Sequence, residues 1–383
     1  VSVTIGAVTV ITAPVDVTDA AAVAAALVAA IAAEPLLATV VTAATDGVDT
    51  VTLTYLTDGA KAEATFAGDV DAGAGSVTAV VAESVAYVPS APATGSLTLT
   101  NMANNGTLEL AGATTTTTVT MTDATGEADV FNIVTNGGGV NYGAVVVDGV
   151  ETINVKAAGT SSATLALDAD VAATVKVTGT SQLFLTLTDA DAVTLVDASA
   201  GFTGKLNLTA TGTEALTVLG GSGVDTLIAS GSGDILRGGE GNDILTGADR
   251  TTLDGGAGTD TFFFNKPTNV NSYSSIVNIN AGDVIDLDVL NAGTVVFAKS
   301  KVALEGTAVF QDLANAAVNA LGADVNDAAW FQFDGNTYIV QSGGSHVGGT
   351  DFQNGVDSIV KIVGLVDLST ASYNQSFGTL ELI

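Results

Sequence analysis

The chain has 383 residues, which is enough for two or three domains of ordinary size. It carries 41 acidic and 10 basic residues, a formal net charge of −31, together with one histidine and no cysteine. Such a charge repels nucleic-acid phosphates and anionic membrane surfaces. The lack of cysteine excludes disulfides, thiolate zinc sites and iron–sulfur clusters. Because 47% of the residues are hydrophobic, we expect a folded protein whose surplus carboxylates bind hard, oxygen-ligated cations.

The N-terminal part carries no predicted targeting or membrane segment. The chain begins with Val1, so we expect a processed form or a piece of a longer protein. No basic region precedes the first apolar run, as a secretory signal peptide would require. The stretch from Ala20 to Ala33 is shorter than the roughly 20 residues of a membrane span and lies between Asp19 and Glu34. We therefore predict a soluble helix and no membrane span.

Residues 1–93 are predicted to form a small α+β surface module. Thr18 or Asp19 is expected to cap the helix, and Pro35 to end it. Strands are expected at 1–11, 49–56, 61–66 and 77–88, with 61–66 as the partner of 49–56. This pattern resembles small surface-exposed modules of flagellins and secreted bacterial surface proteins. Pro89 and Pro92 indicate a linker to the next domain.

Residues 94–219 contain recurring short strands, each with two or three inward apolar residues. From Leu165 to Leu216 these strands follow at steps of 10 or 11 residues. A strand this short cannot bury its apolar face alone, whereas strands stacked coil on coil form one apolar column. A β-sandwich of hairpins is the alternative, since it uses similar strand spacing. The near-constant step favours a parallel β-solenoid.

Five consecutive units of a more specific motif fill residues 220–264. They read GGSGVDTLI, ASGSGDILR, GGEGNDILT, the shortened GADRTTLD, and GGAGTDTFF. The common pattern is G-G-x-G-x-D-x-U-x, in which U is apolar. The first six positions predict a turn so tight that only glycine fits several of them, and x-U-x predicts a short strand with U in the core. A flexible glycine-rich linker is the alternative, but it does not explain why U and Asp stay in phase.

These units predict calcium sites between stacked turns. Each unit makes half a coil, so Asp225, Asp243 and Asp260 are expected on one side and Asp234 on the other. Calcium binds 6–8 oxygen ligands, and we expect it to fold the segment. The fourth unit lacks the expected aspartate, so either Asp249 substitutes for it or that site is empty. The predicted metal-site residues are Gly220, Ser222, Gly223, Asp225, Gly231, Asp234, Gly238, Glu240, Gly241, Asp243, Asp249, Gly255, Ala257, Gly258 and Asp260.

The repeats resemble the RTX β-rolls of proteins exported by type I secretion. DTFFF at 260–264, followed by AGDVIDLDVL at 281–290, is similar to the segment that closes such rolls. FQFDGNTYIV (331–340), DSIVKIVGLVDLS (357–369) and FGTLELI (377–383) resemble the C-terminal regions of bacterial surface-layer (S-layer) proteins exported this way. The resemblance implies an uncleaved C-terminal secretion signal, folding on contact with extracellular calcium, and an anchor at the cell surface such as lipopolysaccharide.

Residues 265–383 are predicted to form a β-rich C-terminal cap that also contains the secretion signal. A helix is expected from Asp312 to Leu321, followed by Gly322 as its C-cap. Asp351, Asn354 and Asp357 are spaced as a calcium loop or as simple turn formers. His346 lies in a glycine-rich stretch without a suitably placed nucleophile, so we predict an exposed loop residue, no catalytic residues and no enzyme activity.

The sequence thus predicts a mainly β protein: a small α+β module, a parallel β-solenoid, a calcium-binding β-roll and a β-rich cap. The predicted function is a secreted structural protein whose copies form a calcium-bridged lattice or filament on the cell surface. The alternatives are an adhesin that recognises a glycan or receptor, and the C-terminal part of a larger RTX exoprotein. About three calcium sites in the roll offset only about six charges. Further calcium sites, or calcium-bridged contacts between copies, are therefore expected at acids elsewhere: Asp46, Asp49, Asp69, Asp71, Asp123, Asp129, Asp168, Asp170, Asp189 and Asp191.

Overall fold

The computed structural model divides into two compact units, the N-terminal unit Val1–Gly204 and the C-terminal unit Lys205–Ile383. From residue 96 onward it describes all residues except 111, 123–124, 127, 137–138, 189–191, 210–213, 230, 265, 288–294, 323–326, 345–350 and 376. Before residue 96 it describes only 2–5, 8–11, 20–34, 41–45, 51–55, 64–67, 76–80 and 85–88. The predicted linker prolines and His346 therefore lie outside the described residues.

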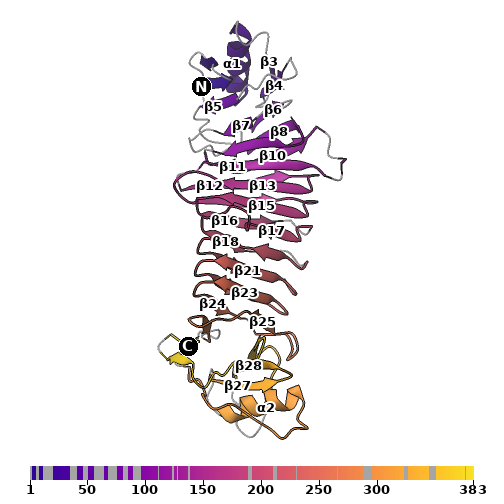
Figure 1. Cartoon of the computed structure of the whole chain (residues 1–383). Helices are drawn as coiled ribbons and strands as arrows, with labels where there is room; N and C mark the ends of the chain where they lie inside the picture. Colours follow the sequence, from indigo (N-terminus) through magenta and orange to yellow (C-terminus); the bar gives the residue numbers. More distant parts are fainter. Residues whose placement is uncertain are drawn as a thin grey trace. The chain divides into compact units, whose positions relative to one another are not determined.

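The N-terminal unit is built almost entirely of short strands stacked coil on coil (Figure 1). Its strands are β1 (Ser2–Ile5), β2 (Val8–Ile11), β3 (Val41–Thr45), β4 (Val51–Tyr55), β5 (Ala64–Ala67), β6 (Ser76–Val80), β7 (Val85–Val88), β8 (Ser96–Met102), β9 (Gly106–Leu110), β10 (Thr116–Met121), β11 (Val130–Thr135), β12 (Val140–Val147), β13 (Thr152–Ala157), β14 (Ala163–Asp168), β15 (Thr174–Gly179), β16 (Leu183–Thr188) and β17 (Leu195–Asp197).

These strands form two sheets that alternate along the chain, in the orders β2-β1-β5-β7-β9-β11-β13-β15-β17 and β6-β8-β10-β12-β14-β16. Pairing is parallel from β5 and β6 onward. Thr152 pairs with Thr174, 22 residues later, so two strands of the predicted step make one coil. The apolar column is visible in Ile133, Val155 and Val177, which pair in register and are at most 1% exposed. The predicted parallel β-solenoid is confirmed, and the β-sandwich alternative is wrong.

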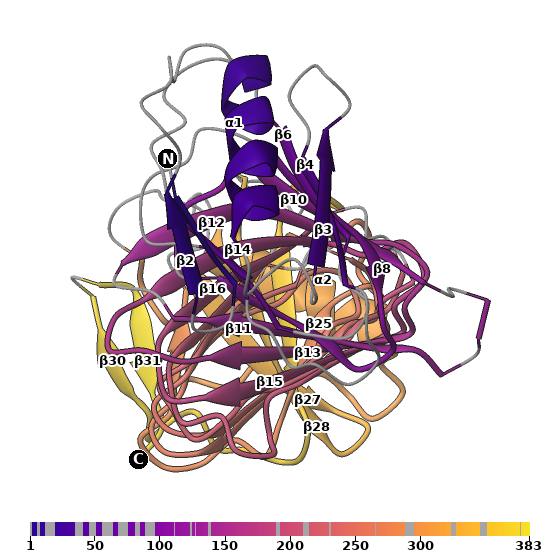
Figure 2. The same cartoon turned by 90° about the horizontal axis from the view of Figure 1, so that it is seen from above.

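The first 93 residues differ in detail from the prediction. Helix α1 (Ala20–Ala33) lies against β2, β3 and β4 and buries Leu27 and Ile31 (Figure 2). The stretch expected as one strand at 1–11 forms two strands, β1 and β2, which pair antiparallel. The apolar alternation changes phase between Ile5 and Val8, which a single strand with one buried face does not allow. Strand β4 pairs with β3, whereas β5, its predicted partner, pairs with β1. Parallel stacking already begins at β6 and β7, before the predicted boundary at residue 94.

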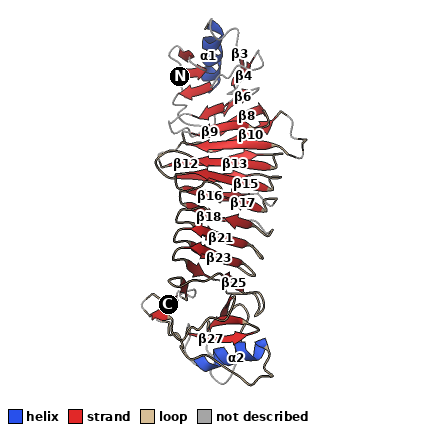
Figure 3. Ribbon diagram, viewed as in Figure 1, coloured by secondary structure: helices blue, strands red, loops and turns tan. Residues whose placement is uncertain are grey.

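The C-terminal unit is also a two-strand coil and ends in a small cap of short strands (Figure 3). This unit has one helix, α2, among its described residues. Its elements are β18 (Leu206–Thr209), β19 (Thr217–Leu219), β20 (Thr226–Ile228), β21 (Ile235–Glu240), β22 (Ile244–Thr246), β23 (Thr252–Ala257), β24 (Thr261–Phe263), β25 (Ser274–Val277), β26 (Val284–Asp286), α2 (Phe310–Leu321), β27 (Ala328–Phe333), β28 (Asn336–Gln341), β29 (Ser358–Ile362), β30 (Ser372–Asn374) and β31 (Thr379–Glu381).

The sheets of this unit have the orders β19-β21-β23-β25-β29-β28-β27 and β18-β20-β22-β24-β26-β31-β30. The U positions of the nonapeptides pair in register and are fully buried, as Leu227, Leu245, Phe262 and finally Ile285 show. Burying a side chain of this size stabilises the fold by about 1.5–3 kcal/mol. The first sheet ends in the antiparallel strands β28 and β27, and the second in β31 and β30.

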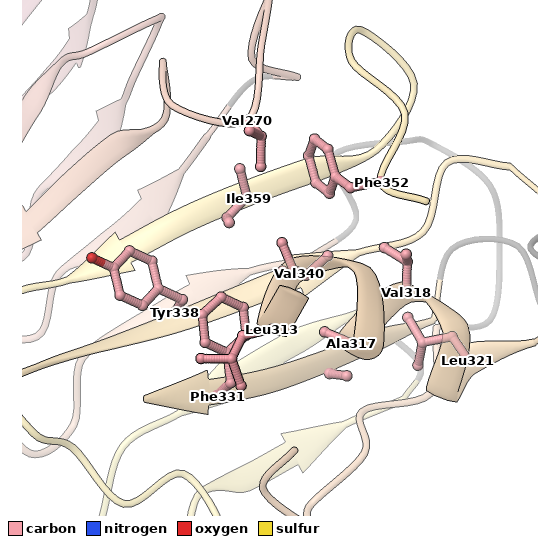
Figure 4. Packing of buried hydrophobic residues seen from close by; sticks show 12 residues of the cluster. Val270, Leu313, Ala317, Val318, Leu321, Phe331, Tyr338, Val340, Phe352 and Ile359 are labelled. Carbon is pink, nitrogen blue, oxygen red and sulfur yellow. The ribbon is translucent and has the colours of Figure 1, made fainter. Parts of the chain in front are cut away.

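The cap has its own apolar core, formed where α2 packs on β27 and β28 (Figure 4). Leu313 and Val318 of α2 contact a cluster that includes Phe331, Tyr338 and Ile359. The helix starts two residues before the predicted Asp312, because the Asp312 carboxylate accepts the Val309 N–H at 3.0 Å and so caps the first turn. Gly322 ends it with a φ of 66°, the left-handed conformation that favours glycine.

Candidate metal centre

A ladder of buried aspartates runs along one side of the nonapeptide coils. Asp225, Asp243 and Asp260 directly precede β20, β22 and β24, and each is at most 1% exposed. The Asp225 N–H donates to Asp243 Oδ1 at 2.7 Å, and the Asp243 N–H donates to Asp260 Oδ1 at 2.9 Å. Each carboxylate therefore binds the backbone of the aspartate one coil earlier. The three side chains that were expected on one side do lie together there.

The ladder extends beyond the predicted residues at both ends. Asp225 Oδ1 accepts the Leu206 N–H at 2.7 Å, and Asp283 Oδ1 accepts the Asp260 N–H at 2.9 Å. Asp283 is buried and precedes β26, but it was not among the predicted ligands. The D-x-U part of the motif recurs at Asp283, Val284 and Ile285, and this pattern could have identified Asp283 from the sequence. The longer connection between β24 and β26 moved this unit out of the nine-residue phase.

Glycine is required in the turns because the stacked backbones approach so closely. A side chain at Gly238 would collide with Asp243 Oδ2 and with the Gly255 carbonyl, and one at Gly255 would collide with Asp260 Oδ2. A side chain at Gly241 would collide with the Gly223 carbonyl oxygen. Gly241 also has a φ of 118°, a backbone conformation that residues other than glycine rarely adopt. Carbonyl and carboxylate oxygens therefore lie next to glycine main chain, with no side chain between, in the turns at 220–224, 238–242 and 255–259.

Two carboxylate oxygens in this cradle have no hydrogen-bond donor among the described residues. Oδ2 of Asp243 and Oδ2 of Asp260 are both buried without a partner, whereas Asp225 Oδ2 accepts the Gly221 N–H at 2.9 Å. A buried ionised oxygen without a donor or a cation is costly. The unpartnered oxygens thus mark the turns 238–242 and 255–259 as the part of the ladder that most needs a bound cation.

Burial also controls the acidity of the ladder. It raises the pKa of Asp243 to about 7, against the opposing effect of the hydrogen bond from the Asp225 N–H and with a further increase from the charges of Asp225 and Asp260. Burial is likewise the main cause of the raised pKa values of Asp225 and Asp260. A cation bound at these oxygens would replace the protons that the calcium-free ladder favours.

On the opposite side of the coils, the polar side chains have more of their hydrogen bonds formed. Asp234 precedes β21 and accepts the Leu216 N–H at 2.9 Å with Oδ1 and the Gly231 N–H at 3.2 Å with Oδ2. One coil later the equivalent position is Thr251, whose hydroxyl accepts the Ala248 N–H at 3.0 Å. Asp249 does not take over that position, because its carboxylate binds the Thr268 N–H and hydroxyl. Whether Asp249 acts as a ligand in the fourth unit therefore stays a prediction, beside the alternative of an empty site.

The remaining predicted residues occupy the turns themselves. The side chains of Ser222, Glu240 and Ala257 are exposed, and their main-chain carbonyls are the ligands that the turn motif would use. Gly220 donates its N–H to the Arg237 carbonyl, and Gly241 donates to the Ala257 carbonyl, which holds successive turns together. Across the described residues, no three His, Cys, Asp or Glu side chains form a metal-binding group, so main-chain oxygens must complete any site on the ladder.

The other predicted calcium loop is a structural turn. Asp357 is fully buried and accepts the Gly343 and Gln353 N–H groups at 2.9 and 2.7 Å. Asn354 accepts the Val270 N–H at 2.9 Å, and Asp351 is exposed. These side chains therefore fasten the loop to its neighbours, in agreement with the turn-former alternative.

The donor set of the ladder fits calcium. Calcium prefers carboxylate and carbonyl oxygens and accepts irregular coordination by 6–8 of them. The stacked turns supply both oxygen types and place unpartnered carboxylate oxygens next to main chain without side chains. Asp225, Asp243 and Asp260 would supply the carboxylates, and the turn carbonyls would complete the shell.

Comparison with known proteins identifies the repeat segment. Residues 219–249 match the family model of the RTX calcium-binding nonapeptide repeat, a model of 4 copies. No curated protein matches the chain. No helix among the described residues has the length and apolar character needed to cross a membrane. RTX repeats are calcium-binding motifs typical of secreted proteins, and here they lie in register on a parallel β-solenoid. The chain therefore contains RTX-type calcium-binding repeats on a parallel β-roll.

Proposed function

We propose that this protein is a secreted, calcium-dependent structural protein whose copies assemble into a bacterial surface layer or an extracellular filament. The observation that carries the proposal is the buried aspartate ladder, in which Asp243 and Asp260 each keep a carboxylate oxygen without a donor. Calcium would fold the roll by satisfying these oxygens. In this proposal the protein acts as a building block and not as an enzyme.

The charge balance supports assembly bridged by cations. Even if all 10 basic residues each paired with one acid, 31 of the 41 acids would still have no basic partner. Calcium in the roll offsets only about six of these charges. Copies of such a chain repel one another unless divalent cations lie between them. Calcium would therefore act twice, first within the roll and then between molecules.

The same chemistry supports export before folding. In low calcium, the ladder must either bind protons or hold buried like charges together, so the roll is unstable. The glycines of the turns add a further entropic cost to ordering. Outside the cell, calcium would fold the chain only after it has emerged. The cell-surface location and a surface anchor such as lipopolysaccharide are part of this proposal.

Electron microscopy of the purified chain tests the assembly step. Samples are first folded at a calcium concentration that saturates the roll, as judged by circular dichroism, and are then imaged at higher calcium, at equal magnesium, and after addition of a chelator. The proposal expects ordered sheets or filaments in calcium that disperse on chelation. Monodisperse, folded particles at every calcium concentration would contradict self-assembly while leaving calcium-dependent folding intact.

A groove in the N-terminal unit favours a second candidate, an adhesin or binding module. The groove lies on the outer face of β9, β11, β13, β15 and β17 and has a volume of about 470 Å³, within the usual range for small-ligand sites. Exposed Lys156 and Lys176 line it beside Asn132 and Asn154. Ammonium and amide groups of this kind suit an anionic sugar. Saturable binding of acidic glycans that is lost in Lys156→Ala and Lys176→Ala would favour this candidate, and a glycan array without such binding would reject it.

A further inference from the structure

The local arrangement of the aspartate ladder recurs in the N-terminal unit, far from the nonapeptides in sequence. Asp129 directly precedes β11, and Glu151 directly precedes β13, the neighbouring strand of the same sheet. The Asp129 N–H donates to Glu151 Oε2 at 2.8 Å, just as the Asp225 N–H donates to Asp243 Oδ1 at 2.7 Å. In both places an acid before a strand binds the backbone of the acid before the preceding strand of that sheet.

The Asp129 carboxylate has one satisfied and one unsatisfied oxygen. Its Oδ1 accepts a hydrogen bond from the Asn104 side-chain N–H at 2.7 Å. The Asn104 Oδ1 in turn accepts the Val130 N–H at 3.0 Å. The Asp129 Oδ2 is buried and has no hydrogen-bond partner among the described residues, and Asp129 as a whole is only 6% exposed. This state matches that of Asp243 and Asp260, whose Oδ2 atoms are also buried and unpartnered.

The surroundings of Asp129 restrict what can satisfy that oxygen. A methyl group at Gly126 would lie 2.8 Å from Asp129 Oδ2, so bare main chain covers this side of the carboxylate, as in the glycine turns. The carboxylate of Glu151, which lies on the next coil, accepts the hydrogen bond of the Asp129 N–H. Two acids at one backbone position repel each other unless a positive charge lies between them. Oxygen ligands and negative charge together select a hard divalent cation.

We propose that Asp129 and Glu151 form a divalent-cation site that is separate from the nonapeptide roll and binds calcium. Asp129 Oδ2 and the Glu151 carboxylate supply the protein charge, and water or main-chain oxygen completes the shell. The site fastens β11 to β13 in the solenoid, as the ladder fastens the coils of the roll. Because it lacks the repeated glycine turn, it has fewer preformed carbonyl ligands and binds more weakly than the roll. The inference does not depend on self-assembly.

The test counts calcium ions on the full-length chain by equilibrium dialysis, with calcium alone as the probe. Asp129→Asn keeps the shape and the Oδ1 acceptor for Asn104 but removes the cation ligand. Asp367→Asn is the matched control, since Asp367 is exposed and its Oδ1 accepts the Ser369 N–H, an interaction that asparagine retains. We expect Asp129→Asn to bind one calcium ion fewer per chain than both the wild-type chain and Asp367→Asn.

Thermal unfolding gives a second reading that does not require counting. The rise in Tm on adding calcium is expected to be smaller in Asp129→Asn than in the wild-type chain, and unchanged in Asp367→Asn. Glu151→Gln, which retains the acceptor for the Asp129 N–H, is expected to weaken the same site and serves if Asp129→Asn does not fold. Wild-type stoichiometry and a wild-type calcium-induced Tm shift in the folded variants would overturn the proposal. Neither reading uses assembly, so dispersed particles under the microscope would leave this test unaffected.

Discussion

Replacing Asp243 by asparagine is expected to change stability in opposite directions with and without calcium. Burial raises the pKa of Asp243 from 3.8 to about 7 in the calcium-free fold. A difference of about three pKa units corresponds to a cost of about 4 kcal/mol for keeping this carboxylate charged in the folded chain at pH 8. Asparagine has the same shape and carries no charge, so Asp243→Asn removes that cost.

The sign of the pH dependence follows from the direction of this shift. The folded pKa lies above the unfolded value, so between about pH 4 and about pH 7 the calcium-free folded chain binds more protons than the unfolded chain. Its stability therefore falls as the pH rises through this window and levels off above it. Asp225 and Asp260, whose pKa values are also raised by burial, act in the same direction. Asp243→Asn is expected to flatten the profile without abolishing it.

Calcium reverses the comparison, because asparagine cannot supply a charged ligand. Asp243 stands between the turns at 220–224 and 255–259, so its loss affects the cation sites on both sides. We expect the calcium midpoint of folding to rise by more than about tenfold, the usual cost of removing even a supporting contact at a metal site. Urea unfolding followed by circular dichroism, in calcium-free buffer at several pH values and in saturating calcium, measures both effects. A variant that is less stable than the wild-type chain in both conditions would refute the reasoning.

Three further substitutions test other parts of the roll. Gly238→Ala is expected to destabilise the calcium-bound roll by about 2 kcal/mol, since its methyl group overlaps Asp243 Oδ2; Gly306→Ala, which has no neighbour within 4 Å, is the control and is expected to leave the calcium-dependent Tm unchanged. Asp234→Asn is expected to cost about 1–3 kcal/mol even without calcium, because both carboxylate oxygens accept backbone N–H groups; a stabilised variant in urea unfolding would contradict this reading. Leu245→Ala is expected to cost about 2–5 kcal/mol in saturating calcium, and a midpoint equal to that of the wild-type chain would show that the buried column is not continuous.

Sequence periodicity was most informative where one short unit repeats without insertion. Leu227, Leu245 and Phe262 keep their phase, so their pairing and burial followed from spacing alone. Asp283 was missed because an insertion separates it from the preceding unit, although the D-x-U signal remains. The N-terminal strands were misassigned for a different reason. The change of phase between Ile5 and Val8 marked the end of one strand and was overlooked, whereas alternation alone does not show which strand becomes the partner.

The state of individual oxygens could not be read from the sequence. Asp234 and Asp243 occupy the same motif position, yet both carboxylate oxygens of Asp234 are bonded, whereas Asp243 keeps one without a donor. Asp249 was a reasonable substitute ligand by composition, but Thr268 binds its carboxylate. The contact between Asp129 and Glu151 depends on a coil of 22 residues that carries no turn motif. These differences arise from tertiary stacking, which brings acids together at separations that no local pattern encodes.

A calcium titration of the full-length chain, followed by far-ultraviolet circular dichroism at constant ionic strength, tests the central claim most directly. If calcium completes the aspartate ladder, β-sheet signal rises cooperatively with calcium and falls again on chelation. Magnesium is expected to be a poor substitute, because it requires a stricter octahedral shell than the turns provide. A spectrum that does not change between calcium-free and calcium-saturated buffer would contradict the claim that calcium folds the roll.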